Sequence, residues 1–106
     1  MYTPDSWIVM KITLFNEGDD VIYKVLGGWT GGYLDGDSWR INSGITRVDN
    51  DDNYYYFYGH TGSCYKCHKQ QEGLRASTSG VWKEFQEGAA NAGGSIVRCS
   101  TDDIKV

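Results

Sequence analysis

The residues best suited to chemistry lie at positions 62–69, which read G-S-C-Y-K-C-H-K. Cys64, Cys67 and His68 have the C-x-x-C-H spacing through which c-type haem is attached to proteins. Together with His60, they could also supply four ligands to a structural zinc ion, because thiolate sulfur and imidazole nitrogen are its usual ligands. The third interpretation is a β-strand that happens to contain two cysteines.

Strand geometry separates these interpretations. Residues 54–58 read Y-Y-Y-F-Y, which strongly favours a strand, and residues 59–62 resemble a tight turn into a second strand. In a strand Cys64 and Cys67 point to opposite faces, with Cα atoms about 10 Å apart at roughly 3.3 Å per residue. Two thiolates on one zinc ion need sulfurs within about 4 Å of each other. We therefore expect a strand, with Cys67 buried and His68 exposed, and the zinc site only if this segment turns.

A turn formed by the four residues 59–62 would place Tyr56 opposite Tyr65 and Tyr54 opposite Cys67. These four residues would form the core face of the hairpin. The other face would carry Tyr55, Phe57, Cys64, Lys66 and His68. Tyr55, Lys66 and His68 would then make an aromatic and basic patch, which is either a solvated face or a surface for a protein or single-stranded nucleic acid.

Further binding candidates are Trp29 and Tyr33 in the glycine-rich stretch G-G-W-T-G-G-Y, and Trp39 after it. Exposed aromatic rings on a sheet can stack on bases or sugars, although Trp and Tyr also fill the cores of small β proteins. No phosphate-binding glycine loop is present, and nothing marks an oxyanion site near the cysteines. The sequence thus predicts no catalytic residue and no cofactor.

The elements that position these residues follow from hydrophobic periodicity. Alternation predicts strands at residues 6–15, 21–26, 39–45, 54–58, 63–69 and 95–99. Apolar residues at helical spacing predict a helix that begins at Ser77 or Ser79 and stops at Gly93 and Gly94. We expect a single α+β domain over residues 1–106. Its twisted antiparallel sheet would have five or six strands, open or partly closed into a barrel, with one C-terminal helix.

Composition narrows the classes of partner. The net charge is −4, whereas most general nucleic-acid binders carry a basic face. Three cysteines are an odd number, no signal peptide is visible, and no apolar run reaches membrane-spanning length. These features predict a cytoplasmic protein with reduced thiols and no membrane contact.

Two long stretches, residues 27–48 and the segment Y-Y-F-Y-G-H-T-G-S-C-Y-K-C-H-K, resemble an uncharacterised family of small proteins. The family occurs in tailed phages and in marine environmental sequences. Its pattern contains Y-K-C-H-K but no cysteine at the position of Cys64. The resemblance implies a phage accessory protein that acts in the host cytoplasm by binding.

The leading functional hypothesis is therefore a non-enzymatic interaction domain. It would bind a protein partner or another copy of itself through an aromatic sheet face or an edge strand. The first alternative is a small zinc domain that uses His60, Cys64, Cys67 and His68. The second is a single-stranded nucleic-acid binder that uses Tyr55, Lys66, His68 and Trp29.

Overall fold

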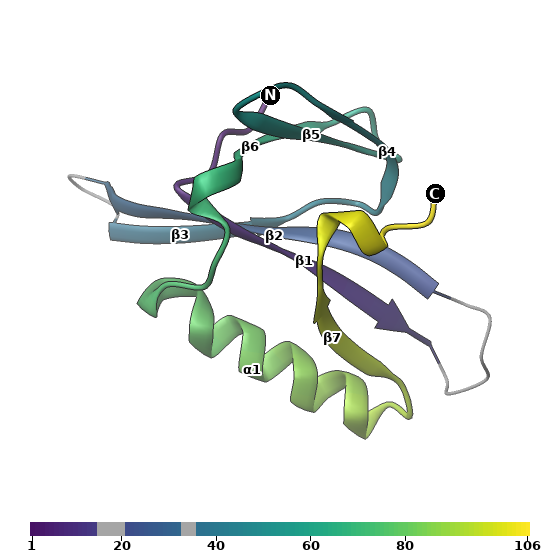
Figure 1. Ribbon diagram of the computed structural model, residues 1–106. Coiled ribbons are helices and arrows are strands. Elements are labelled where there is room, and N and C mark those ends of the chain that lie inside the picture. Colours follow the sequence, from purple (N-terminus) through teal and green to yellow (C-terminus); the bar gives the residue numbers. More distant parts are fainter. Residues whose placement is uncertain (15–20, 33–35) are drawn as a thin grey trace.

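The computed structural model describes residues 1–14, 21–32 and 36–106, which form seven strands and one long helix (Figure 1). The strands are β1 Ser6–Thr13, β2 Val21–Gly32, β3 Gly36–Ile41, β4 Ile45–Asn50, β5 Tyr54–Gly59, β6 Cys64–His68 and β7 Ser95–Cys99. The helix α1 spans Ala76–Asn91, and short 3-10 helices cover Lys69–Gln71 and Thr101–Asp103. The predicted turn at residues 16–20 and the candidate residue Tyr33 lie outside the described residues.

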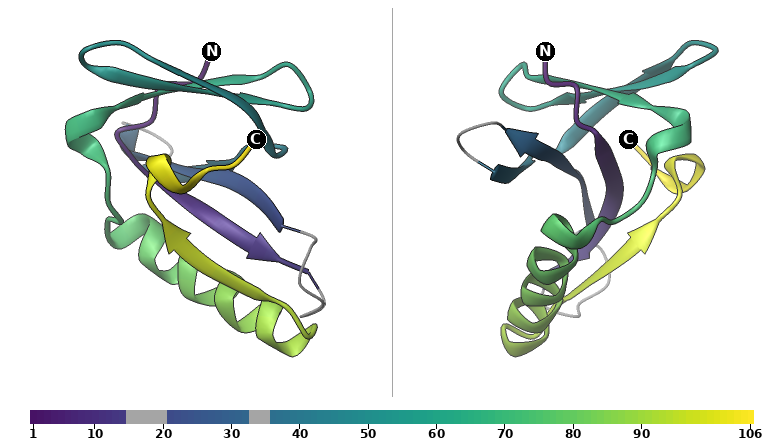
Figure 2. Two further views of the ribbon diagram at one scale, coloured as in Figure 1. Left: turned by 45° about the vertical axis from the view of Figure 1, so that its right-hand side comes forward. Right: turned by 90° about the vertical axis from the view of Figure 1, so that its left-hand side faces the viewer.

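The strands form two sheets, with the orders β3-β2-β1-β7 and β4-β5-β6, and all neighbouring strands are antiparallel. Figures 1 and 2 show three layers, in which the four-stranded sheet lies between α1 and the three-stranded sheet. The predicted α+β antiparallel class is confirmed. The expectation of one sheet is wrong, because the strands divide into two sheets and neither closes into a barrel.

The division occurs at residues 42–44, where the sequence had predicted one continuous strand. Asn42 is buried, its backbone N–H donates to the carbonyl of Val25 over 3.1 Å, and its side-chain oxygen accepts from the Val25 N–H. Gly44 has a φ of 129°, a backbone conformation that glycine adopts without steric cost. The chain therefore leaves the four-stranded sheet after Ile41 and starts the second sheet at Ile45.

Strand β1 is buried on both faces over residues Ser6–Met10. Trp7 and Val9 belong to the core that includes Phe57 of the three-stranded sheet. Ile8 and Met10 point the other way and belong to the core beneath α1. The two apolar cores therefore meet at the backbone of β1, which joins the three layers.

The helix begins slightly earlier than predicted, at Ala76, and the residue that closes its first turn is Thr78. The Thr78 hydroxyl accepts a hydrogen bond from the Arg75 N–H over 3.1 Å, which satisfies one donor at the helix start. The predicted stop is confirmed: Gly93 has a φ of 85°, and the Gly94 N–H donates to the Ala89 carbonyl. No helix in the described residues is long and apolar enough to span a membrane.

Candidate functional site

The register of the β5–β6 hairpin decides which aromatic residues reach the surface. The Gly59 N–H donates to the Ser63 carbonyl over 2.9 Å, and Gly62 has a φ of 84°. The loop is thus the three-residue kind that closes with a glycine in the left-handed region. Tyr58 lies opposite Cys64, so the predicted four-residue turn is wrong and the true register differs by one residue.

Because side chains alternate along a strand, this one-residue difference places the other set of β5 side chains on the same face as Cys67 of β6. Tyr55 lies opposite Cys67 and Phe57 opposite Tyr65, and all four belong to the core or pack against it. The predicted burial of Cys67 is confirmed, whereas the predictions that Tyr55 and Phe57 face outward are wrong.

The outer face of the three-stranded sheet carries a cluster that we call the tyrosine face. It consists of Tyr54, Tyr56 and Tyr58 on β5, Arg47 and Asp49 on β4, and Lys66 and His68 on β6. The sequence had placed Tyr54 and Tyr56 in the core, and the register shift accounts for that error. Lys66 and His68 are on this face as predicted, but His68 is half-buried rather than fully exposed.

Cations lie over the rings of the tyrosine face. The Arg47 guanidinium carbon is 4.2 Å from the centre of the Tyr58 ring, and the Lys66 Nζ is 4.3 Å from the centre of the Tyr54 ring. The His68 ring meets Tyr54 edge-on, with centroids 5.0 Å apart. Arg47 also forms an ion pair of 2.7 Å with Asp49. These contacts favour this arrangement of the side chains over the central strand.

Asp51, in the β4–β5 turn, anchors one edge of the tyrosine face. It accepts a 2.7 Å hydrogen bond from the Tyr56 hydroxyl and further bonds from the backbone N–H groups of Asn53 and Tyr54. The Tyr56 bond, followed by the two backbone bonds, lowers the pKa of the Asp51 carboxyl. The same bond to Asp51 is the main cause that raises the pKa of Tyr56 to about 12.

This pair predicts a pH-dependent contribution to stability. A carboxyl whose pKa falls on folding stabilises the protein above its unfolded pKa of about 3.9, and loses that contribution as the pH falls. We expect Tyr56→Phe to lower the free energy of unfolding at pH 7, and the difference from wild type to shrink below about pH 4. Urea denaturation of both proteins between pH 2.5 and pH 7 measures this, and a difference that stayed constant over that range would contradict it.

The cysteines are arranged as strand geometry predicted. Cys64 and Cys67 lie on opposite faces of β6, because residues three apart in a strand point in opposite directions. Burial raises the pKa of the Cys67 thiol, which favours an inert, protonated group. His60 is exposed in the hairpin loop, with its ring against Gly44. In the described part of the chain, no three His, Cys, Asp or Glu residues are grouped so that they could hold a metal ion.

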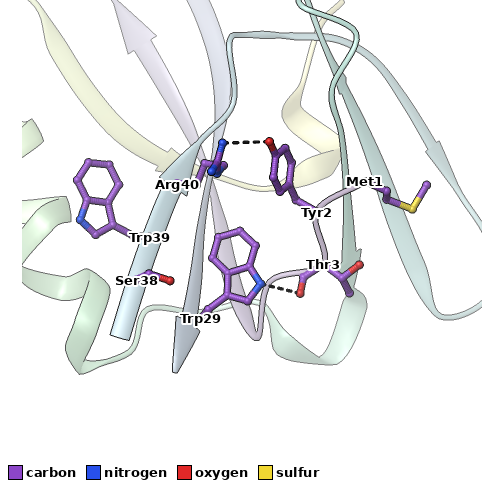
Figure 3. Close-up of a pocket in the computed structure, with 7 residues that line it drawn as sticks. All are labelled: Met1, Tyr2, Thr3, Trp29, Ser38, Trp39 and Arg40. Carbon is purple, nitrogen blue, oxygen red and sulfur yellow. Dashed lines mark hydrogen bonds between the residues drawn. The ribbon is translucent and has the colours of Figure 1, made fainter. Parts of the chain in front are cut away.

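A second surface surrounds a pocket of about 320 Å³ beside β3, which we call the β3 pocket (Figure 3). Its lining includes Tyr2, Trp29, Ser38, Trp39 and Arg40. The predicted candidate Trp29 is half-buried here, and its indole N–H donates to the Thr3 carbonyl over 3.0 Å. Arg40 lies over the Tyr2 ring, with 4.4 Å between its guanidinium carbon and the ring centre, and donates to the Tyr2 hydroxyl.

The structure brings the predicted binding residues together only in part. Lys66 and His68 share the tyrosine face, Trp29 lies in the β3 pocket, and Tyr55 faces the core. Arg47 was missed, although alternation along β4 places it on the same face as Asp49. Tyr2 and Arg40 carried no local signal, because their contact joins the start of the chain to β3.

Comparisons with known proteins gave no relative. No family model matches the chain, and neither the curated proteins nor the solved structures contain a match. The functional assignment therefore rests on the chemistry of these two surfaces.

Proposed function

We propose that the chain is a non-enzymatic interaction domain that binds a protein partner through the tyrosine face. The observation that carries this proposal is the alternation of Tyr54, Tyr56 and Tyr58 along the central strand of a sheet (Figure 2). No other element of the described residues covers the outer face of this sheet in Figure 2. Tyr and Arg are enriched among the residues that dominate binding energy at protein interfaces. Rings that are already held in place lose little entropy on binding.

The charges of the tyrosine face also fit a protein partner. Arg47 and Lys66 are offset by Asp49, and by Asp51 at the edge of the face, so both signs are present within one small surface. Mixed charges of this kind give specificity through complementary pairs across an interface. A partner that combines apolar side chains with both acidic and basic groups would match this surface.

Single-stranded nucleic acid is the second candidate, because aromatic rings beside cations form stacking platforms in such binders. Two features of the tyrosine face favour a protein instead. Lys66 and Arg47 already lie over the rings of Tyr54 and Tyr58, where a base would have to stack. The carboxylates of Asp49 and Asp51 would repel the phosphate backbone. Retention of a labelled oligonucleotide at low salt that falls steeply as salt rises would favour nucleic acid.

Zinc binding through His60, Cys64, Cys67 and His68 is less favoured, because Cys67 lies in the core while Cys64 and His68 lie on the other face of β6. Elemental analysis of protein purified without chelator tests it directly, and a full equivalent of zinc would revive it. The resemblance to phage proteins supports an accessory role in a host cytoplasm, where a small acidic protein would act by binding.

We test the protein-binding proposal with the double variant Tyr54→Ala and Tyr58→Ala. The matched control is Lys83→Ala with Glu84→Ala, at exposed positions of α1. Wild-type protein and control are expected to retain the same protein from a bacterial host lysate, and the double variant to retain at least tenfold less of it. Circular dichroism confirms that each variant is folded. Equal retention by all three proteins would contradict the proposal, as would no retention by a wild-type protein that stays monomeric at high concentration.

A further inference from the structure

Strand β3 ends the four-stranded sheet and leaves one side of its backbone without a partner strand in the described residues (Figure 1). The Asn42 N–H donates to the Val25 carbonyl, so Asn42 and Val25 form a hydrogen-bonded pair of the antiparallel ladder. Such pairs recur at every second residue, so Arg40 with Gly27 and Ser38 with Trp29 are the next ones along β3. The main-chain groups of Arg40 consequently point toward β2. Those of Trp39 and Ile41 point toward the open edge, where an extended peptide could pair with them.

The side chains beside this edge differ on the two faces of β3. Ser38 and Arg40 lie on the face of the β3 pocket, next to Trp29, whereas Trp39 points the other way (Figure 3). The Trp39 ring meets Phe85 of α1 edge-on, with centroids 5.6 Å apart. Trp39 is 47% exposed, which is unusual for a residue with such a large apolar surface. A strand added here would therefore find aromatic side chains on both faces.

The charge of the β3 pocket is positive. Arg40 is the one charged side chain among the described residues that line it, and no carboxylate is present among them. The Tyr2 hydroxyl accepts a hydrogen bond from only one of the five N–H donors of the Arg40 guanidinium. The stacking on Tyr2 holds the guanidinium in place for a planar, bidentate partner. This arrangement is complementary to a carboxylate.

Strand β4, the edge of the other sheet, offers a comparison. Its outer face carries the Arg47–Asp49 ion pair, and its pairing with β5 shifts register between Ile45 and Arg47. Charged side chains and bulges are the features by which proteins discourage pairing at sheet edges. Strand β3 also carries a charged side chain, Arg40, and its pairing with β2 shifts register between Trp29 and Gly32. The difference from β4 is the exposed Trp39 in the middle of the β3 edge.

We propose that β3 binds an extended acidic peptide segment of a partner protein as an added antiparallel strand. The peptide residue opposite Arg40 would carry a carboxylate, the next residue would place an aromatic ring beside Trp39, and the third would place an apolar side chain near Trp29 and Ser38. Cross-strand neighbours lie about 4.5–5.5 Å apart, which is within reach of these contacts. The order from the N-terminus of the peptide is thus acidic, aromatic, apolar. This site lies on the four-stranded sheet, whereas the tyrosine face lies on the three-stranded sheet. The peptide-binding proposal therefore does not depend on the proposed function of the tyrosine face.

The test uses three capped peptides and an NMR titration of the 15N-labelled protein. The probe is acetyl-Thr-Glu-Phe-Val-Thr-amide, the charge control replaces its Glu with Gln, and the backbone control carries N-methyl-Phe. We expect the probe to shift the amide signals of β3 and the indole signals of Trp29 and Trp39. The Gln peptide should bind about threefold more weakly, as for an exposed ion pair. The N-methyl peptide should bind at least about tenfold more weakly, because a main-chain donor is lost.

Variants of the protein locate the charge. Arg40→Gln should bind the Glu and Gln peptides equally, whereas Arg98→Gln, on the other edge strand of the same sheet, should keep the threefold preference. Three results of the peptide titrations would overturn the proposal: no shift with millimolar probe, equal binding of the Glu and Gln peptides by the wild-type protein, or unchanged binding of the N-methyl peptide. A dimer formed through β3 without peptide would also overturn it, since a second copy would then occupy the edge. The peptide comparison uses wild-type protein, so it stands even if Arg40→Gln does not fold.

Discussion

Replacing Trp7 with alanine is expected to lower the free energy of unfolding by about 3–5 kcal/mol. Trp7 is fully buried on the face of β1 that meets the three-stranded sheet. Its ring packs on Phe57 and Tyr55, with centroid distances of 5.4 and 5.8 Å, and its indole N–H donates to the His68 carbonyl over 2.8 Å. One side chain thus contacts both strands of the β5–β6 hairpin, and its loss would leave a cavity between the sheets.

Urea denaturation measures this effect, and two variants separate its causes. Trp7→Phe keeps an aromatic ring but leaves the His68 carbonyl without its donor, so we expect a loss of about 1–3 kcal/mol. Trp39→Ala removes an exposed tryptophan and should cost about 1 kcal/mol or less. A Trp7→Ala protein no less stable than Trp39→Ala would show that Trp7 does not join the two sheets.

The second large effect is expected at Gly28, where β2 meets the start of α1. A Cβ atom at this position would lie 2.7 Å from the Thr78 Cγ2 and 3.3 Å from the Ser6 Oγ. Both neighbours are buried and cannot turn into solvent. Gly28→Ala should therefore lower the free energy of unfolding by about 1–3 kcal/mol, the usual cost of overpacking.

A double-mutant cycle assigns this cost to one contact. Thr78→Ser removes the methyl group that the new Cβ would meet, and it keeps the hydroxyl that accepts from Arg75. The combination with Gly28→Ala should thus be more stable than the sum of the two single effects predicts. Gly80→Ala is the matched control, because no atom beyond its chain neighbours and the backbone of its own helix lies within 4 Å of its Cβ position, and alanine favours the helix. Strict additivity of Gly28→Ala and Thr78→Ser would exclude the proposed contact.

Local patterns predicted the elements of this fold well. The last strand was expected at residues 95–99, and β7 spans Ser95–Cys99. The helix stop at Gly93 and the hairpin around residues 59–62 were also correct, because glycines and periodicity act over a few neighbouring residues. These features depend on nothing distant in the chain.

The errors arose where a local pattern allows two solutions or where distant residues decide. A single residue in the length of the β5–β6 loop determines whether Tyr55 or Tyr56 faces outward, and both loop lengths are compatible with the sequence G-H-T-G. The second sheet exists because Asn42 binds the backbone of β2, a contact that no periodicity records. The grouping of side chains on the tyrosine face and around the β3 pocket depends on this loop length and on such distant contacts. The residue types of both surfaces could therefore be seen in the sequence, whereas their grouping could not.

The position of β7 has a consequence for how the protein folds. This strand places Val9 beside Cys99, so the central sheet is completed only when the two ends of the described chain meet. Contacts between residues so distant in sequence close a long loop, and folding slows as the average separation of contacting residues grows. The hairpin of β5 and β6 is local and can form early. During synthesis, the four-stranded sheet therefore cannot be completed until β7 has left the ribosome and paired with β1.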